Sequence, residues 1–183
     1  MFNIRSLTVG IVATNCYLVW NKATGEGVLI DPGDEAERIC SAIAEERVKL
    51  KAILLTHGHF DHILVAEELK EKYEVPLYAS KDEKEMLENP QWNLSGMDEG
   101  VTITEYIPVQ DGDKLELLGK EWQVISTPGH TNGSVCYFVP WEIPYLFSGY
   151  TLFYESYGRT DLYGGSEVEI KKSIKEKLFC LPD

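Results

Sequence analysis

The segment ILLTHGHFDH, residues 53–62, carries the densest group of potential metal ligands in the chain. A short apolar run ends at Thr56, and three histidines and an aspartate follow it: His57, His59, Asp61 and His62. Imidazole and carboxylate groups are ligands for zinc and iron, so this density favours a metal site over a histidine-rich surface loop. The flanking residues predict a buried strand (KAILLT, 51–56) and then a helix (HILVAEELKEKY, 62–73). The ligands would therefore lie at the carboxyl end of a strand, where α/β sheets place their sites.

The residues before this segment predict three strands and a helix. FNIRSLTVG (2–10), NCYLVW (15–20) and GVLID (27–31) are rich in branched and aromatic residues, as strands are. Asp34 and Glu37 have the spacing of a capping box that would begin a helix. Apolar residues at helical spacing follow, so this helix would place one face against a sheet.

The residues after it predict further strands and helices. A strand at 75–80 and a short helix at 81–89 lead into residues 89–100, which carry no pattern and would form either a lid over the substrate or a plain connection. Five more strands are expected: 101–109, 114–119, 121–127, 134–139 and 145–149. A long loop (151–166) follows, and its last residue, Ser166, forms a capping box with Glu169 for a last helix that docks on a sheet.

The composition predicts one globular domain that binds neither nucleic acid nor membranes. A chain of 183 residues, 44% of them hydrophobic, can bury a sizeable core. We expect a single domain, residues 1–183, built of two similar halves, roughly 1–100 and 101–183. The net charge of −13 would repel a phosphate backbone. The sequence contains neither an apolar run of membrane-spanning length nor the pattern of a signal peptide.

The cysteines bear on the cellular compartment. The chain has four of them, widely spaced within apolar patterns: Cys16, Cys40, Cys136 and Cys180. Such spacing predicts buried thiols in a reducing cytosol rather than a disulfide framework. We therefore expect a cytoplasmic protein.

Four motifs along the chain form a specific combination: D-P-G at 31–33, T-H-G-H-F-D-H at 56–62, T-P-G-H-T at 127–131 and G-R-T-D-L at 158–162. In this combination the chain resembles the metallo-β-lactamase fold superfamily, and within it the short single-domain hydroxyacylglutathione hydrolases (glyoxalase II-like proteins). The resemblance implies an α/β (α+β) fold, the αββα sandwich. It also implies that His57, His59 and His130 form one metal position, and that Asp61 and His62 contribute to a second.

The resemblance further implies a metal-dependent hydrolase that cleaves a small-molecule thioester, such as S-(2-hydroxyacyl)glutathione, by attack of metal-bound hydroxide. The cofactor would be one zinc ion, or two, although iron and manganese accept the same ligands. Asp61 would ligate the metal and orient the attacking water, and it could also cap the following helix. Arg159 and Tyr154 would contact the substrate, unless Arg159 only forms a salt bridge within its turn.

One departure from the family pattern concerns Tyr150. The family carries an aspartate that bridges two metals in a G-D-T-L-F segment, whereas residues 149–153 here read G-Y-T-L-F. A phenol of pKa about 10 must lose a proton before it ligates, which costs about 4 kcal/mol at pH 7, and it offers a single oxygen. Tyr150 is therefore either a ligand whose pKa the metal lowers or a ring that blocks the second position.

A second departure concerns the family's last ligand, a histidine in a C-terminal turn. The chain has four histidines, and all of them stand in the motifs above, so none is left for that role. The resemblance then implies that a terminal strand and helix are missing, and that an open sheet edge could pair two chains into a homo-oligomer. Two other functions therefore stay open: an iron-dependent persulfide dioxygenase, and a non-catalytic, metal-poor remnant that binds or dimerises.

Overall fold

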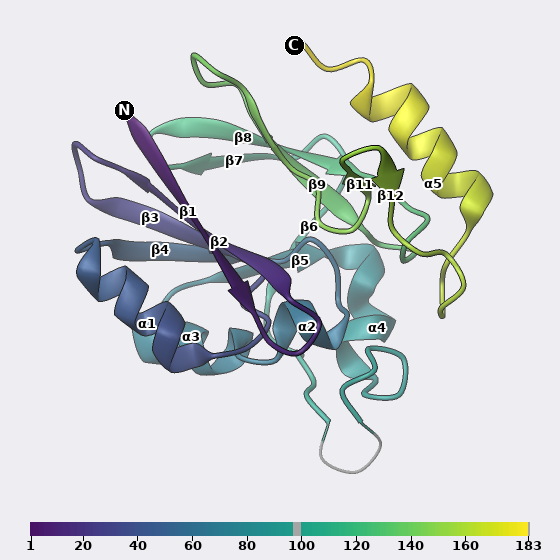
Figure 1. Cartoon of the computed structure of the whole chain (residues 1–183), viewed down its shortest axis with the longest axis horizontal. Coiled ribbons are helices and arrows are strands. Elements are labelled where there is room, and N and C mark those ends of the chain that lie inside the picture. Colours follow the sequence, from purple (N-terminus) through teal and green to yellow (C-terminus); the bar gives the residue numbers. More distant parts are fainter. Residues whose placement is uncertain (97–99, 183) are drawn as a thin grey trace.

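Two β-sheets pack face to face between outer layers of helices (Figure 1). This is the arrangement in a computed structural model of the chain, which describes residues 1–96 and 100–182. In Figure 1, α1 and α3 lie beside the first sheet, and α5 lies on the far side of the second. The expected αββα sandwich is confirmed.

The first sheet holds six strands in sequence order: β1 (Phe2–Val9), β2 (Thr14–Asn21), β3 (Glu26–Ile30), β4 (Lys49–Leu54), β5 (Leu77–Ser80) and β6 (Ile107–Val109). The pairs β1–β2 and β2–β3 are antiparallel, and the strands from β3 to β6 pair in parallel. Parallel neighbours end at the same edge of a sheet, so the loops that follow β3, β4 and β5 meet there.

The second sheet is antiparallel and has the strand order β10-β9-β8-β7. Its strands are β7 (Lys114–Leu117), β8 (Lys120–Ser126), β9 (Val135–Val139) and β10 (Tyr145–Phe147). A small hairpin follows, formed by β11 (Leu152–Phe153) and β12 (Ser156–Tyr157). This hairpin lies within the residues that the sequence predicted as one irregular loop, so that prediction missed it.

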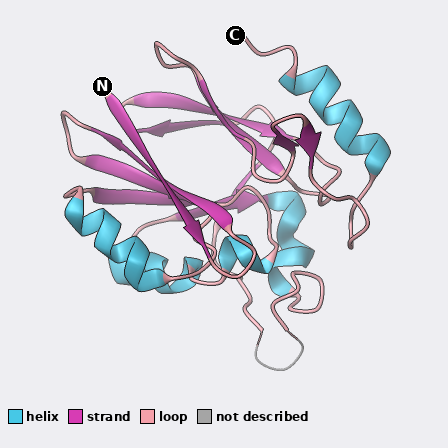
Figure 2. Ribbon diagram, in the orientation of Figure 1, coloured by secondary structure: helices cyan, strands magenta, loops and turns pink. Residues whose placement is uncertain are grey.

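The helices are short, and they are coloured cyan in Figure 2. They are α1 (Ala36–Glu45), α2 (Phe60–Ile63), α3 (Ala66–Tyr73), a 3₁₀ turn η1 (Lys81–Glu83), α4 (Lys84–Glu88), α5 (Glu167–Ser173) and a π-helical turn η2 (Ile174–Leu178). The side chain of Ser166 caps α5 by accepting a hydrogen bond from the N–H of Glu169, as predicted. No helix in the described part of the chain is long and apolar enough to cross a membrane.

Strand periodicity divides the core into layers. Along β3, Val28 and Ile30 point between the two sheets, whereas Leu29 points toward the helices on the outer face. This alternation follows from the two-residue repeat of a strand, and it explains why β3 is apolar on both faces. On the outer face of the second sheet, Ile170 and Ile174 pack in a third cluster. The predicted docking of the last helix on a sheet is thus confirmed.

Several local predictions were wrong. The strand predicted at 101–109 forms only as β6, and the helix predicted at 62–73 breaks between α2 and α3. The predicted capping box of Asp34 and Glu37 does not form, because α1 begins after Glu35, whose backbone is left-handed (φ 55°). The unpatterned loop at 89–100 includes residues 97–99, so its predicted role as a lid lies partly outside the described residues.

The cysteines are all unpaired, as predicted, but they are not all buried. Cys16 and Cys136 are buried, Cys40 is half-buried, and Cys180 is exposed. Cys180 lies just beyond the end of η2. The sequence pattern marked it as apolar because its neighbours Phe179 and Leu181 are apolar.

Candidate metal centre

The ends of β3 and β4 are tied together beneath the site. Asp31, directly after β3, accepts hydrogen bonds from the backbone N–H and the hydroxyl of Thr56, each at 2.7 Å. Asp31 is buried and has a left-handed backbone (φ 52°). The D-P-G motif thus has a structural role: it anchors the residue that precedes His57.

The same motif also packs against α2. A Cβ atom added to Gly33 would lie 1.6 Å from the carbonyl oxygen of Asp61, so only glycine fits between these two backbones. His59 stands at the N-cap position of α2, and Asp61 and His62 lie in its first turn. Four ligand-type side chains of this one segment are therefore buried: His57, His59, Asp61 and His62.

Three of the predicted ligands converge. His57 follows β4, His59 precedes α2, and His130 lies in the loop between β8 and β9. Each has at most 2% of its surface exposed, and one ligand atom from each lies within 4.8 Å of those of the other two. Histidines from both sheets therefore meet at a spacing that a metal ion can use.

Hydrogen bonds leave a lone pair on one nitrogen of each of these rings. His130 donates from Nδ1 to the Arg159 carbonyl oxygen at 2.7 Å, so its Nε2 is an acceptor. His59 Nδ1 lies 2.9 Å from that atom and must be the donor, which leaves His59 Nε2 unprotonated. The Thr56 hydroxyl donates to Asp31 and accepts from His57 Nδ1 at 3.1 Å, which leaves His57 Nε2 unprotonated.

Burial keeps these rings neutral. Loss of water lowers the pKa of His57 well below its ordinary value, and lowers that of His59 to about 3, with the neighbouring histidines adding to both effects. Burial also lowers the pKa of His130. Among the described residues, the Nε2 atoms of His57 and His59 have no hydrogen-bond partner. Neutral, buried, unpartnered imidazole nitrogens are suited to a divalent metal, so the residues present fit such an ion.

Asp61 and His62 lie beside this cluster and contact Tyr150. Tyr150 donates its hydroxyl hydrogen bond to Asp61 Oδ2 at 2.9 Å, and Thr14 donates to the same oxygen at 2.6 Å. His62 has Nδ1 2.9 Å from Asp31 Oδ2 and Nε2 3.4 Å from Asp61 Oδ2, but neither nitrogen is aligned for a hydrogen bond. In the described part of the chain, both nitrogens of His62 are thus buried without a hydrogen bond.

The pKa values of Tyr150 and Asp61 follow from their surroundings. The pKa of Tyr150 is raised to about 12: burial is the main cause, a hydrogen bond from Thr14 opposes it, and the nearby Asp61 carboxylate adds to it. For Asp61, burial acts to raise the pKa, but His62 and the hydrogen bonds from Thr14 and Tyr150 outweigh it and lower the pKa overall. At neutral pH the contact is therefore between a phenol and a carboxylate.

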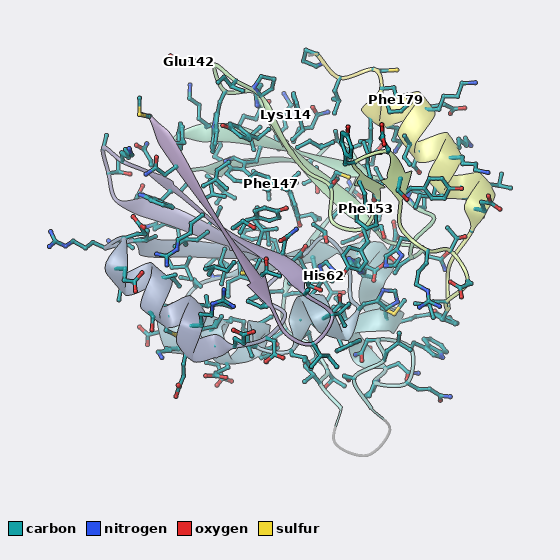
Figure 3. All side chains as sticks on the ribbon, in the orientation of Figure 1. His62, Lys114, Glu142, Phe147, Phe153 and Phe179 are labelled. Atoms are coloured by element: carbon teal, nitrogen blue, oxygen red, sulfur yellow. The ribbon has the colours of Figure 1, made fainter. Side chains whose placement is uncertain are left out.

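The two residues predicted to contact substrate have different surroundings. Arg159 forms a bidentate salt bridge with Asp161, at 2.8 and 2.7 Å, on the surface, so the turn salt bridge is present. Its link to the site is its backbone carbonyl, which holds His130. Tyr154 is 92% exposed and borders a cavity of about 360 Å³. His62 and Phe153, both labelled in Figure 3, line the same cavity, as does Tyr150.

Sequence reasoning missed two polar residues of this region, Thr14 and Glu83. Thr14 is buried at the start of β2, where it reaches Asp61. Glu83 has only 2% of its surface exposed, and its carboxylate accepts hydrogen bonds from both ligand-bearing loops. In the sequence Glu83 stands within a charged run, K-D-E-K-E, which is typical of a solvated helix surface, so no local signal distinguishes it.

Comparisons with known proteins agree on the family. The model of the metallo-beta-lactamase superfamily matches residues 9–179. Hydroxyacylglutathione hydrolase GloC from Haemophilus influenzae is 34% identical over 185 residues, which cover 99% of this chain and 86% of that protein.

Two solved structures extend this likeness. The BLEG-1 B3 metallo-beta-lactamase superposes with a TM-score of 0.90 at 35% identity, covering 100% of this chain and 88% of that one. TTHA1623 in a di-iron-bound form superposes with a TM-score of 0.84 at 32% identity, covering 97% and 87%.

Proposed function

Because the chain belongs to the metallo-beta-lactamase superfamily, we propose that it is a metallohydrolase that cleaves a small-molecule thioester such as S-(2-hydroxyacyl)glutathione. One observation carries the proposal: three buried, neutral histidines each place a ring nitrogen at metal-ligand spacing from the other two. The choice of a thioester is supported by the 34% identity to GloC across nearly the whole chain. The likeness to a B3 metallo-beta-lactamase makes a β-lactam the competing substrate.

His57, His59 and His130 would hold the divalent ion, each through one ring nitrogen. When bound, such an ion lowers the pKa of water from about 15.7 to about 7 and so supplies a nucleophile at neutral pH. Zinc and iron both accept three imidazoles, so the donor set alone is compatible with either metal. The Arg159 carbonyl and Thr56 would orient His130 and His57, because a hydrogen bond to the second ring nitrogen fixes the tautomer.

We propose that the site takes one ion rather than two. The Tyr150 ring lies 4.5 Å from the His62 ring, measured between centroids, and its hydroxyl engages the Asp61 carboxylate. The phenol thus fills the space between Asp61 and the histidines, where a second ion would need an anionic ligand. A pKa of about 12 opposes its conversion to phenolate. TTHA1623, by contrast, has been observed with two irons.

Asp61 would orient the attacking water. Its carboxylate is ionised at neutral pH and is held in place by Thr14 and Tyr150. An ionised carboxylate accepts a hydrogen bond from water and aligns it toward the substrate. A thioester needs little further help, because its thiol leaving group has a pKa of about 8.5 and departs as thiolate. The cavity bordered by Tyr154 and Phe153 would receive the substrate.

Metal content is the first test. Protein purified without chelator or added metal should contain about one zinc or iron per chain by elemental analysis, and His59→Ala should contain none. The loaded protein should then hydrolyse S-lactoylglutathione faster than a β-lactam such as nitrocefin. Metal-free protein would overturn the proposal. Oxygen consumption with glutathione persulfide and no thioester hydrolysis would support the metal site but would identify the reaction as that of a persulfide dioxygenase.

A further inference from the structure

Glu83 connects the two loops that carry the three histidines. It ends η1, directly after β5, and its carboxylate is buried. Oε2 accepts a hydrogen bond from the N–H of Gly58 at 2.9 Å, and Gly58 stands between His57 and His59. Oε1 accepts from the N–H of Gly133 at 2.9 Å and from the Thr131 hydroxyl, and Thr131 follows His130. One side chain therefore binds both ligand loops.

The backbone packs closely at both ends of this connection. A Cβ atom on Gly58 would lie 2.8 Å from Met86 Cγ and 3.0 Å from Glu83 Oε2. A Cβ atom on Gly133 would lie 2.5 Å from the backbone nitrogen of Glu83. Each loop thus presses a glycine against the turn formed by η1 and α4.

The turn itself is fixed in place. The Ser80 hydroxyl oxygen accepts a hydrogen bond from the N–H of Asp82 and so caps η1. Ser80 is the last residue of β5, a strand inside the parallel part of the first sheet. The position of Glu83 is thereby fixed relative to the first sheet. Its hydrogen bonds with Thr131 and Gly133 then hold the loop between β8 and β9 of the second sheet.

We propose that Glu83 is a positioning residue that sets the distance between the His57–His59 loop and the His130 loop, and so determines how tightly the site binds its metal. The inference rests on the proposed metal function. Glu83 does not touch the three imidazoles; it acts through the backbone and through Thr131. Residues that orient metal ligands typically change affinity by about 10–100-fold when they are mutated.

The arrangement requires a carboxylate of this length. Three donors point at Glu83, and a carboxylate can accept all of them because it carries lone pairs on both oxygens. A glutamine would turn an NH₂ group toward at least one of these donors and leave that pair unsatisfied. An aspartate is one methylene shorter and could not reach both loops at once. Glu83→Gln is therefore the sharpest probe, since it keeps the size of the side chain.

The test measures metal binding directly. Zinc affinity is determined by competition with a chromophoric chelator, and the cobalt-substituted protein reports ligand geometry through its visible absorption bands. We expect Glu83→Gln to weaken zinc binding about 10–100-fold and to change the cobalt spectrum. The control is Glu88→Gln, at the end of the adjoining helix α4 and exposed, where the carboxylate lies 4.0 Å from the Lys84 ammonium, and it should match wild type. Urea unfolding of the metal-free proteins measures stability separately.

A second pair of variants covers the case in which Glu83→Gln does not fold. Thr131→Val removes the hydroxyl that donates to Glu83 and should weaken zinc binding, whereas Thr131→Ser retains the hydroxyl and should bind like wild type. Wild-type affinity and an unchanged cobalt spectrum in Glu83→Gln or Thr131→Val, with stability alone reduced, would overturn the inference but not the proposed function. A wild-type protein that binds no metal would overturn both.

Discussion

His59 Nδ1 donates a hydrogen bond to His130 Nε2 at 2.9 Å, although the two residues are 71 positions apart. His59 follows a strand of the first sheet and His130 a strand of the second, so this bond crosses the sandwich. It also occupies the lone pair of His130 that a metal would use. Metal binding must therefore replace this hydrogen bond, and the bound ion would take over the link between the two sheets.

A metal that binds the native state should raise stability, and this effect should require His130. At a free zinc concentration of 100 times Kd, one site adds about 2.7 kcal/mol. We expect a clear zinc-dependent rise in the thermal midpoint for wild type and none for His130→Ala. His62→Ala is the control, because His62 is buried at the same site but lies outside the three-histidine cluster. An equal loss in both variants would contradict the ligand set.

Tyr150→Phe should leave the metal count at about one per chain. If the phenol only fills space and donates to Asp61, its ring suffices to exclude a second ion. The lost hydrogen bond should raise the pKa of Asp61, because hydrogen bonds to an ionised carboxylate stabilise it. Elemental analysis and the acid limb of the pH–rate profile measure these two effects. A fall in metal content on removal of the hydroxyl would instead make Tyr150 a ligand.

The sequence predicted most of the elements and the metal motif because these signals are local. His57, His59, Asp61 and His62 lie within six residues, and strand and helix periods repeat over a few positions. Interactions between distant residues were not predictable in this way. The donors to Glu83 lie between 25 and 50 positions away, and nothing near Glu83 in the sequence indicates them.

The start of α1 shows the same limit. Asp34 and Glu37 have the local spacing of a capping box, yet Glu35 takes a left-handed backbone that moves the helix start. The Glu35 carboxylate accepts hydrogen bonds from the N–H of Gly10, in the turn between β1 and β2, and from Arg38. A tertiary contact therefore overrode the local signal.

Gly33→Ala should destabilise the protein by about 3 kcal/mol or more, because the new methyl group would collide with the Asp61 carbonyl oxygen 1.6 Å away. Relief of the collision would move α2 and its ligands, so zinc affinity should fall as well. Gly112→Ala is the control: Gly112 has φ +83°, but a Cβ atom there would meet nothing within 4 Å. It should lose about 1 kcal/mol through backbone strain and keep its zinc affinity. Urea unfolding and chelator competition separate the two effects.

Acid should destabilise the metal-free protein, beginning at the pH where unfolded histidines take up protons. His57 and His59 have strongly lowered native pKa values, and that of His130 is also lowered, against about 6.5 when unfolded. Below that pH the unfolded chain binds protons that the native protein excludes, so the free energy of unfolding falls as pH falls. Each such proton contributes a slope of about 1.4 kcal/mol per pH unit.

Protonation of Glu83 has the opposite effect on the free energy of unfolding. The sign of the pH dependence is therefore set by the difference between the protons that the histidines exclude and the proton that Glu83 binds in the native state. Burial raises the pKa of Glu83 to about 7, so between the ordinary value of 4.5 and 7 the native state holds up to one extra proton. The two strongly shifted histidines outweigh it, which leaves about one net proton on average and a slope of about 1.4 kcal/mol per pH unit between pH 6 and 5. Urea unfolding in the presence of a chelator measures this slope, and His59→Gln should reduce it by about one proton. A free energy of unfolding that stays constant or rises from pH 6.5 to 5 would show that the histidines are not held neutral. It would also contradict the tautomers inferred from their hydrogen bonds.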